Sequence, residues 1–473
     1  MPDTEEHVER ELKFDVAADW QLPDPSGLTP AEGSVGQASA HLETTYFDTA
    51  ARDLLRSRLT LRRRTGDVDA GWQLKVPAGD ARTEIRLPLS GRGMPAELRE
   101  ATRGVRGGAA LNPLATLVTE REIHRLLDDD GTALAEIVVD SVTALEIRDV
   151  GVTRHWREVE VELVEGDERL LDQAARWLLK RGATRSPSSS KLARAVDVET
   201  GKPRDTTMLY GLVGTYLDTQ ADAIVRGDID LRRGESVVHP TRVGTRRYRS
   251  VLRVLGELFD PDRAAALDAE LAWFAAGLGT VRDLQVLRTH LDAALAELPA
   301  ELVAGPIAER IHATLAAEEQ EAAARLATLM RTKRYFALLT ELREWREQLP
   351  MITDAPAEDV ARYVAKAERR VKRRLKAVPK HGARDEPLHR VRKAAKRARY
   401  VAELARPELG KRARTAQLRM KQTQERLGFR QDCVVAAEFL RRVAAAAAAA
   451  GEDGFTYGLL HERELSRAAA IRG

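Results

Sequence analysis

Two periodicities of apolar and polar residues divide this chain of 473 residues into two parts. Before about Val198, short segments alternate apolar and polar residues with a period of two, which is typical of strands. From about Thr206 onward, apolar residues recur at helical spacing, as in LDAELAWFAAGL. The pattern predicts an α+β multidomain protein, with a strand-rich N-terminal part and an all-α C-terminal part. The expected strands are VERELKF, LTLRRR, WQLKV, RTEIRLPL, AEIVVD and REVEVEL.

Glycine and proline mark the expected junctions. The polar stretch 196–205 contains Gly201 and Pro203, which predicts a linker at 199–205 between domains at 1–198 and 206–473. Segments 23–37 and 88–113 are rich in Gly and Pro and are expected to be loops, the second with room for a short helix in MPAELREATRGV.

The polar faces of the expected strands carry many charges. In the first strand, Glu9, Glu11 and Lys13 share one face, and Val8, Leu12 and Phe14 share the other. A sheet with one solvated face explains any single strand of this kind. Six such strands, with acids and bases mixed across their polar faces, equally suit the lining of a wide barrel whose apolar face packs against helices. The other polar-face residues are Thr60, Arg62, Arg64, Gln73, Lys75, Arg82, Glu84, Arg86, Glu136, Asp140, Glu158, Glu160 and Glu162.

A lining of this composition suits phosphate chemistry. Several carboxylates can hold a hard divalent cation such as Mg²⁺ or Mn²⁺, which prefers oxygen ligands. Arginine and lysine form charge-assisted hydrogen bonds with phosphate oxygens. Together these groups predict a site for metal-assisted phosphoryl chemistry.

Several short motifs resemble those of the CYTH family, the triphosphate tunnel metalloenzymes. GluArgGluLeuLys at 9–13 is similar to the ExExK signature of that family. Further elements follow in the family's order: TyrPheAspThr at 46–49, LeuArgArgArg at 61–64, LeuLys at 74–75, Arg82 with Glu84, Arg121, GluValGluValGluLeu at 158–163, and SerLys at 190–191. The resemblance implies an eight-stranded antiparallel β-barrel, the triphosphate tunnel, in residues 1–198.

The resemblance also implies roles for individual residues. It places Glu9, Glu11 and Glu160 in catalysis. It implies metal ligands among Glu9, Glu11, Glu158, Glu160 and Glu162, with Glu84, Glu136 and Asp140 orienting the bases or reaching a second metal. The residues expected to bind the phosphates are Lys13, Arg62, Arg64, Lys75, Arg82, Arg121 and Lys191.

Charge is distributed unevenly along the chain. The formal net charge is only +3, yet residues 1–200 hold 27 basic and 36 acidic side chains, and the remainder holds 49 and 37. Residues 362–430 hold 24 basic and 6 acidic side chains. A solvated helix face normally pairs its charges, so this excess favours an anionic partner. Aromatic residues make up only 5% of the chain, and no nucleic-acid-binding motif is visible, so a specific nucleic acid is not expected.

The helical part contains an internal repeat. The segment that begins at His239 is similar to the one at His389, and LeuGlyThrValArgAsp from Leu278 is similar to LeuGlyPheArgGlnAsp from Leu427. The similarity predicts a duplicated helical bundle, with copies at about 206–350 and 355–473. Helical spacing places basic residues on one stripe in each copy: His239, Arg242, Arg246, Arg249 and Arg253 in the first, and His389, Arg392, Lys396 and Arg399 in the second.

These helical motifs resemble the CHAD domain, and the resemblance implies binding of inorganic polyphosphate. An ordinary solvated helix face remains the alternative for each stripe. Asp283 and Asp432 are expected to cap helices or pair with the bases, and Cys433 to fill a buried space. The residues expected to bind polyphosphate are His239, Arg242, Arg246, Arg247, Arg249, Arg253, Arg334, His389, Arg392, Lys393, Lys396, Arg397, Arg399 and Lys421.

The leading hypothesis is hydrolysis of inorganic triphosphate or polyphosphate in the N-terminal domain, with Mg²⁺ or Mn²⁺, and polyphosphate capture by the C-terminal domain. The alternatives are a non-catalytic polyphosphate scaffold and a hydrolase of an organic triphosphate such as thiamine triphosphate. The chain has a single cysteine, a polar start and no long apolar run, which together predict a cytoplasmic protein without a membrane partner. Polyphosphate binding would in addition allow association with polyphosphate granules. The sequence leaves the oligomeric state open.

Overall fold

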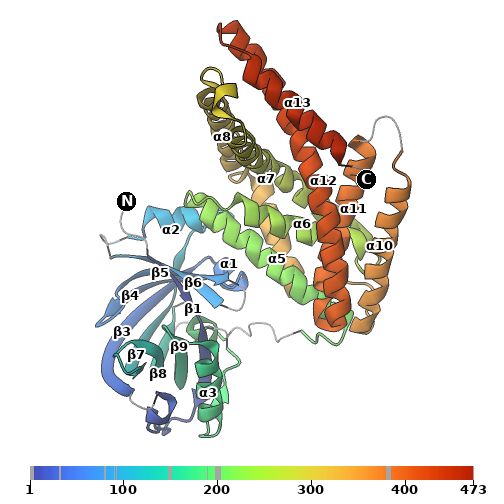
Figure 1. The fold of residues 1–473 in the computed structure, drawn as a ribbon. Coiled ribbons are helices and arrows are strands. Elements are labelled where there is room, and N and C mark those ends of the chain that lie inside the picture. The colour runs from blue at the N-terminus through green and yellow to red at the C-terminus, as the bar shows by residue number, and fades with distance from the viewer. Residues whose placement is uncertain are drawn as a thin grey trace. The chain divides into compact units, whose positions relative to one another are not determined.

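The computed structural model describes residues 5–30, 33–78, 81–89, 91, 93–147, 152–188, 190–197, 204–379 and 385–471, with the side chains of residues 5–9 outside the description. The chain forms two compact units, Met1–Pro203 and Arg204–Gly473. The first is built around an antiparallel sheet and the second is helical (Figure 1). The predicted α+β composition is confirmed.

Ten strands form the described sheet of the first unit. Their hydrogen-bonded order is β1-β6-β5-β4-β3-β7-β8-β9-β2-β10, and every neighbouring pair is antiparallel. The strands are β1 (Glu5–Glu9), β2 (Glu11–Val16), β3 (Ser34–Asp48), β4 (Thr60–Gly66), β5 (Gly71–Ala78), β6 (Ala81–Leu87), β7 (Asn112–Leu127), β8 (Ala133–Glu146), β9 (Thr153–Leu163) and β10 (Thr184–Arg185).

The expectation of eight strands closed into a barrel was wrong in two details, because the described order is open and contains ten strands. The first expected strand is interrupted at Arg10, so that β1 pairs with β6 while β2 pairs with β9. The two-residue strand β10 adds to the far side of β2. Strands β1 and β2 are consecutive in the chain but lie near opposite edges of the sheet. The short connection between them therefore brings these two edges close to each other.

The two faces of the sheet have different partners. The apolar side chains of β2, β8 and β9, including Phe14, Ile137 and Val159, pack against α3 (Glu168–Leu179). Helix α4 (Lys191–Ala195) packs against residues of the opposite face, including Tyr46, Leu117 and Val142. This arrangement turns the charged face inward and the apolar face toward a helix, which is the second of the two interpretations that the alternation allowed.

The longest strands were not foreseen. Strand β3 begins at Ser34 within an expected loop, and β7 begins at Asn112 at the end of another. The inward positions of β3 include Ala40, Thr44 and Tyr46, so the contrast in hydropathy between its two faces is weak. Two short helices complete the unit, α1 (Asp53–Arg56) and α2 (Ala96–Ala101), and the second confirms the helix expected within 88–113.

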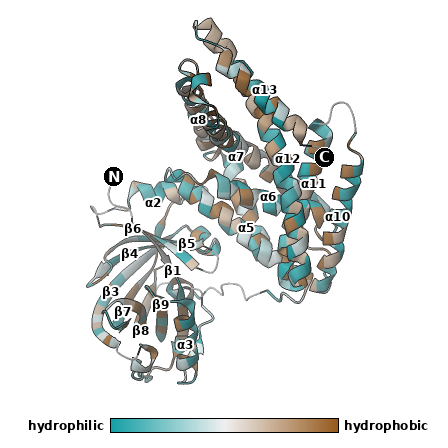
Figure 2. Cartoon of the chain, viewed as in Figure 1, coloured by the Kyte–Doolittle hydropathy of each residue, from teal (hydrophilic) through white to brown (hydrophobic). Residues whose placement is uncertain are grey.

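The second unit is described as nine helices. They are α5 (Leu209–Arg232), α6 (Val238–Val254), α7 (Pro261–Ala296), α8 (Ile307–Leu329), α9 (Lys333–Glu347), α10 (Val360–Lys376), α11 (Asp385–Leu404), α12 (Arg406–Ala449) and α13 (Phe455–Ala470). Helix α6 and its repeat counterpart α11 pack against each other. Figure 2 shows hydrophilic residues along much of α10 and α12, in keeping with the basic stretch 362–430.

Helix α7 is long and apolar enough, by length and composition, to cross a membrane, and it is the one such helix in the described part of the chain. Its apolar side chains Leu267, Leu271, Phe274 and Leu278 belong to the core of the second unit. Packing within the bundle therefore explains the hydropathy of this helix.

Candidate functional site

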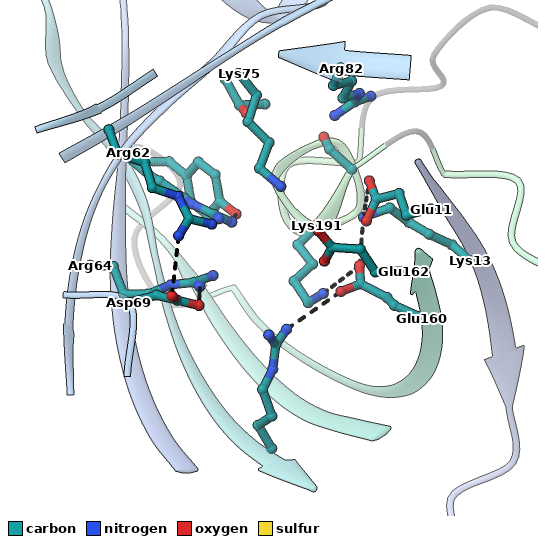
Figure 3. Close-up of a pocket in the computed structure, with 15 residues that line it drawn as sticks. Glu11, Lys13, Arg62, Arg64, Asp69, Lys75, Arg82, Glu160, Glu162 and Lys191 are labelled. Carbon is teal, nitrogen blue, oxygen red and sulfur yellow. Dashed lines mark hydrogen bonds and ion pairs between the residues drawn. The ribbon is translucent and has the colours of Figure 1, made fainter. Parts of the chain in front are cut away.

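The inward face of the sheet surrounds one charged pocket (Figure 3). Among the described residues, eight basic and four acidic side chains line the pocket, which leaves a formal excess of four positive charges. We call it the charged pocket; its lining residues are Glu11, Lys13, Tyr46, Thr60, Arg62, Arg64, Asp69, Lys75, Arg82, Arg86, Arg121, Glu160, Glu162, Ser190 and Lys191. An excess of cations suits an anionic ligand.

Strands β2 and β9 provide an acidic wall. Glu11 lies opposite Glu162 in the register of these strands, and Lys13 lies opposite Glu160, so the three carboxylates are cross-strand neighbours on one face. The ammonium group of Lys13 contacts Glu160 Oε1 at 2.5 Å and Glu11 Oε1 at 3.3 Å. Figure 3 shows Glu11, Glu160 and Glu162 gathered on one side of the pocket.

The arginines of β4 lie on the other side of the pocket (Figure 3). Arg62 donates from Nε to Gln73 Oε1 at 2.5 Å and from one terminal nitrogen to Glu84 at 3.2 Å. Arg64 donates from Nε to Thr44 Oγ1 at 3.4 Å and lies 3.7 Å from Asp69. Burial, and then the neighbouring cations Arg62 and Arg121, lower the pKa of Arg64 to about 10. A bound anion would relieve this crowding of positive charge.

Lys191 contacts all three carboxylates of a buried cluster. The hydroxyl of Ser190 accepts a hydrogen bond from the backbone of Ala193, which caps α4 and directs its first residue, Lys191, to the sheet. The Nζ atom of Lys191 lies 2.9 Å from Asp140, 2.7 Å from Glu158 and 2.7 Å from Glu160. One oxygen atom of each carboxylate lies within 4.8 Å of the other two.

Arg121 joins the same cluster from β7. Its guanidinium donates two hydrogen bonds to Asp140, at 2.8 and 2.7 Å, and one to Glu160 at 3.4 Å. Glu160 therefore contacts Lys13, Arg121 and Lys191, and belongs both to the buried cluster and to the pocket lining. This carboxylate links the acidic wall to the interior of the unit.

The charges of this network set its protonation. Burial raises the pKa of Glu160, but Lys13, Lys191 and Arg121 outweigh burial and hold that pKa well below its usual value. Burial likewise raises the pKa of Glu11, but Lys13, Lys75 and Arg82 together outweigh burial and lower that pKa. Glu11 and Glu160 are thus ionised at neutral pH, which is the form that a cation requires.

The acidic wall fits a hard cation better than the buried cluster does. Asp140 and Glu158 contact Lys191 but do not line the pocket, and Glu158 also accepts a hydrogen bond from Trp156 Nε1 at 2.5 Å. Glu158 therefore lies outside the pocket lining, although the sequence suggested it as a ligand. Glu11, Glu160 and Glu162 face the pocket with oxygen donors, the type that Mg²⁺ and Mn²⁺ prefer.

All seven residues expected to bind phosphate in the first domain line the charged pocket. Glu11, Glu160 and Glu162 line it as well, whereas the side chain of Glu9 lies outside the described residues; the backbone of Glu9 pairs with that of Arg82. Glu136 pairs instead with Arg125 at 2.7 Å, outside the lining. Glu84 is fully buried and holds Arg62 and Arg86.

Sequence reasoning missed several lining residues. The alternation placed Arg86 on the polar face of its strand with Arg82, but no phosphate-binding role was assigned to it. Asp69 lies in the turn between β4 and β5, where no periodicity operates, and Tyr46 lies on the unforeseen strand β3.

The second unit gathers cations where its two repeats meet. Arg242 and Arg246 on α6 correspond to Arg392 and Lys396 on α11, and we call these four residues the central cationic cluster. Burial first, and then the other three members, lower the pKa of Lys396 to about 7. Arg242 lies 3.4 Å from Asp283, as expected for that acid. The Nε atoms of Arg246 and Arg392 are buried without hydrogen-bond partners in the described structure.

Other residues expected to bind polyphosphate lie in separate ion pairs. Arg249 and Arg253 both bind Asp268, at 3.0 and 2.6 Å, and Arg247 binds Glu403 at 2.8 Å. Three of the remaining residues have their own partners: Arg334 pairs with Glu270 at 2.7 Å, Lys421 pairs with Glu425 at 3.6 Å, and Arg399 donates to Gln424 at 3.1 Å. The side chains of His239 and Lys393 are exposed, and those of His389 and Arg397 are half-buried. Only part of each basic stripe therefore contributes to the central cationic cluster, and the other basic residues lie in separate contacts.

Comparisons with known proteins agree with this division. The CYTH domain matches residues 7–196, and the CHAD domain matches residues 215–441. Two uncharacterized proteins of Mycobacterium tuberculosis, MT2285 and Rv2226, are each 36% identical to the chain over 98% of its length and 94% of their own.

Solved structures with similarity to the chain include proteins related to either unit. PptA from Streptomyces chartreusis is 21% identical over 55% of this chain and 95% of its own, with a TM-score of 0.47. The CHAD domain from the plant Ricinus communis is 23% identical over 55% and 87%, with a TM-score of 0.44. A putative adenylyl cyclase from Hippeastrum, described as having a dominant triphosphatase activity, is 18% identical over 41% and 98%, with a TM-score of 0.25. From the domain matches and the full-length relatives, the chain belongs to the family of proteins in which a CYTH domain is followed by a CHAD domain.

Proposed function

We propose that the first unit hydrolyses inorganic triphosphate or the end of a polyphosphate chain, with Mg²⁺ or Mn²⁺. The supporting observation is the division of the charged pocket into an acidic wall and an opposing arginine wall. Carboxylates repel phosphate, so a pocket that only bound anions would gain nothing from Glu11, Glu160 and Glu162. Their presence among eight cations supports a site for a metal and a phosphate chain together.

The residues divide the chemistry between them. Glu11, Glu160 and Glu162 would hold the cation through their carboxylate oxygens. When bound, a divalent cation supplies positive charge to phosphoryl oxygens and neutralises charge that develops in the transition state. Arg62 and Arg64 bind the phosphate oxygens from the opposite wall, and their fixed hydrogen bonds to Gln73, Glu84 and Thr44 keep the guanidinium groups oriented. An ionised carboxylate of the acidic wall orients the attacking water.

Hydrolysis of tripolyphosphate tests this proposal. The full chain is expected to release phosphate from tripolyphosphate in Mg²⁺ or Mn²⁺, and to stop when the metal is chelated. Faster turnover of thiamine triphosphate or of a nucleoside triphosphate would instead assign an organic substrate. Tight binding of tripolyphosphate without release of phosphate, in either metal, would show a scaffold and contradict the catalytic assignment.

Replacement of Glu11 by Gln is expected to lower kcat for tripolyphosphate by about 100-fold or more, since the neutral amide removes a charged group from the acidic wall. Glu43→Gln is the matched control, because Glu43 is an exposed residue of β3. Its steady-state kinetics should equal those of the parent chain. Equal rates in Glu11→Gln and the parent would contradict the role of the acidic wall.

For the second unit, we propose that the central cationic cluster binds polyphosphate. The buried Nε atoms of Arg246 and Arg392 lack partners in the described structure, and an unpaired buried donor is costly. Phosphate oxygens would supply the missing acceptors. Four cations meet at this place, and the neighbouring carboxylates are those of Asp283 and Asp432.

The double variant Arg242→Gln with Arg392→Gln is expected to weaken binding of long-chain polyphosphate by about tenfold, and to flatten the dependence of affinity on salt, because two phosphate contacts are lost. Arg325→Gln is the control, since Arg325 is exposed on α8 and pairs with Glu321. Titrations at several salt concentrations give both quantities. An unchanged affinity and slope in the double variant would remove the cluster from the binding site.

A further inference from the structure

Three helices of the second unit bring unlike donor atoms together at a buried point. His290 lies on α7, Cys433 on α12 and Glu464 on α13. One ligand atom of each residue lies within 4.8 Å of the other two. Cys433 and Glu464 are fully buried, and the imidazole of His290 is 11% exposed. This triad lies in the helical unit and contains none of the residues discussed for phosphate binding.

The triad is organised around the carboxylate of Glu464. Its Oε2 atom lies 2.6 Å from His290 Nε2, and its Oε1 atom accepts a hydrogen bond from Arg467 at 3.0 Å. The thiol of Cys433 also donates to this carboxylate. The carboxylate of Glu464 thus has three partners, and two of them, the His290 ring nitrogen and the Cys433 sulfur, are atoms that bind transition metals. Arg467 would remain on Oε1 while Oε2 faces the site.

The local packing fixes the donors. Leu287 and Leu291 precede and follow His290 on α7, and both are buried in a cluster that contains Leu440 of α12 and Leu460 of α13. The three backbones are thus held by apolar contacts on either side of the donor atoms. The ring of Phe429, which is 45% exposed, lies 5.8 Å from the imidazole of His290. The partly exposed ring of Phe429 therefore packs beside the imidazole of His290.

The donor set selects the kind of cation. Mg²⁺ and Mn²⁺ prefer oxygen donors, such as those of the acidic wall, whereas one sulfur, one nitrogen and one oxygen donor suit Zn²⁺ or Co²⁺. Burial, and then Glu464, raise the pKa of the Cys433 thiol to about 12, so the sulfur carries its proton at neutral pH when no cation is near. Formation of a metal–sulfur bond replaces the S–H bond, and the proton leaves to solvent.

We propose that His290, Cys433 and Glu464 form a zinc site that fastens α13 to α7 and α12, with water in the fourth position. The site is structural, and its existence does not depend on the hydrolytic activity proposed for the first unit. Its cation differs in kind from the one expected at the acidic wall. The chain would accordingly hold two classes of metal ion at two separate places.

Titration with Co²⁺ tests the proposal, because a cobalt–thiolate bond absorbs in the near ultraviolet. The chain has one cysteine, so any such band must come from Cys433. The metal-free full chain, in excess Mg²⁺ to occupy the acidic wall, is expected to develop the band with one equivalent of Co²⁺. Zn²⁺ should then displace Co²⁺ and abolish the band. Absence of a thiolate band at saturating Co²⁺ in the unmodified chain would overturn the proposal.

Variants add a second measurement. Cys433→Ser is expected to abolish the band, and Glu464→Gln to weaken Co²⁺ affinity by at least about tenfold. His312→Gln is the matched control, because His312 also contacts a carboxylate, Asp292 at 2.6 Å, but belongs to no metal-competent triad in the described structure. Equal Zn²⁺ stoichiometry by elemental analysis in the parent and in Cys433→Ser would refute the site even if Glu464→Gln failed to fold.

Discussion

Replacement of Lys191 by Met is expected to destabilise the first unit by about 3–5 kcal/mol, the usual cost of removing one partner from a buried ion pair. Lys191 is the common partner of Asp140, Glu158 and Glu160. Without its ammonium group, three buried carboxylates would rely on the remaining cations Arg121, Lys13 and Arg194. Hydrogen exchange of the amides of β8 and β9 measures this loss, because it reports opening of the unit that contains them.

The pH dependence of this variant separates charge from packing. Lys191 helps to hold the pKa of Asp140 and Glu160 low, so its removal raises both. A carboxyl group whose folded pKa rises above its unfolded value costs stability at neutral pH, and that cost fades as pH falls through the folded pKa. The deficit of Lys191→Met is therefore expected to be smaller at pH 5 than at pH 7. A deficit that does not change with pH would indicate lost packing instead.

Lys180→Met is the matched control, since Lys180 is exposed at the end of α3. Its effect on the free energy of unfolding is expected to be within about 0.5 kcal/mol. Activity supplies a further check. Lys191→Met should reduce tripolyphosphate hydrolysis at pH 7, because loss of Lys191 rearranges Glu160 in the acidic wall and removes one cation from the pocket. Parental stability and activity in Lys191→Met would refute the central role of this network.

Alternation along the strands was enough to predict much of the pocket. Side chains at every second position of a strand share a face, so Glu11 with Lys13, and Glu160 with Glu162, could be assigned together before the pairing was known. The resemblance to the CYTH family then joined strands that are distant in sequence. The alternation could not show that Glu158 turns to Lys191 and Trp156, because α4 begins about thirty residues later and is fixed by packing.

The helical unit was predicted less completely for a different reason. Helical spacing placed Arg242, Arg246, Arg249 and Arg253 on one stripe, yet the last two bind Asp268 on the next helix. An acid on a neighbouring helix is invisible to periodicity, which describes one helix at a time. The offset between the repeats was more informative, because the equivalent positions Arg242 and Arg392, and Arg246 and Lys396, are the ones that meet. Residues 380–384 lie outside the described structure.

Lys396 makes the proposed polyphosphate site sensitive to pH. With its pKa lowered to about 7 by burial and by three arginines, this lysine is partly neutral near neutral pH. A bound polyanion favours the charged form and must take up a proton above that pKa. By linkage, affinity then falls as pH rises, by up to about tenfold per pH unit until the pKa of the bound state is reached.

The expected result is a loss of polyphosphate affinity of about tenfold or more between pH 7 and pH 9 at constant salt. Burial and nearby cations lower the pKa of His239 and of His389, so these imidazoles change charge below this window. The other charged groups around Lys396 are Arg242 and Arg246 on α6, Arg392 on α11, Asp283 on α7 and Asp432 on α12.

Two substitutions of Lys396 are expected to remove the pH dependence but to have opposite effects on polyphosphate affinity. Lys396→Arg keeps a positive charge at every pH of the window, so it should bind well and lose the pH dependence. Lys396→Met should bind weakly at pH 6.5 and also lack the dependence. Lys372→Arg is the control, because Lys372 is exposed on α10, and it should follow the parent. A parental pH profile in Lys396→Arg would assign the proton to another group.

Lys396→Met is expected to stabilise the folded chain although it weakens polyphosphate binding. The folded pKa of Lys396, about 7, lies below the usual lysine pKa of 10.5, so the unfolded chain binds more protons between these values. Stability therefore rises with pH across that interval, and the charged lysine costs stability below pH 7. Lys396→Met should raise the melting temperature most at pH 6 and least at pH 10. Gained stability with lost affinity would show that these cations are kept together for a ligand at the expense of the fold.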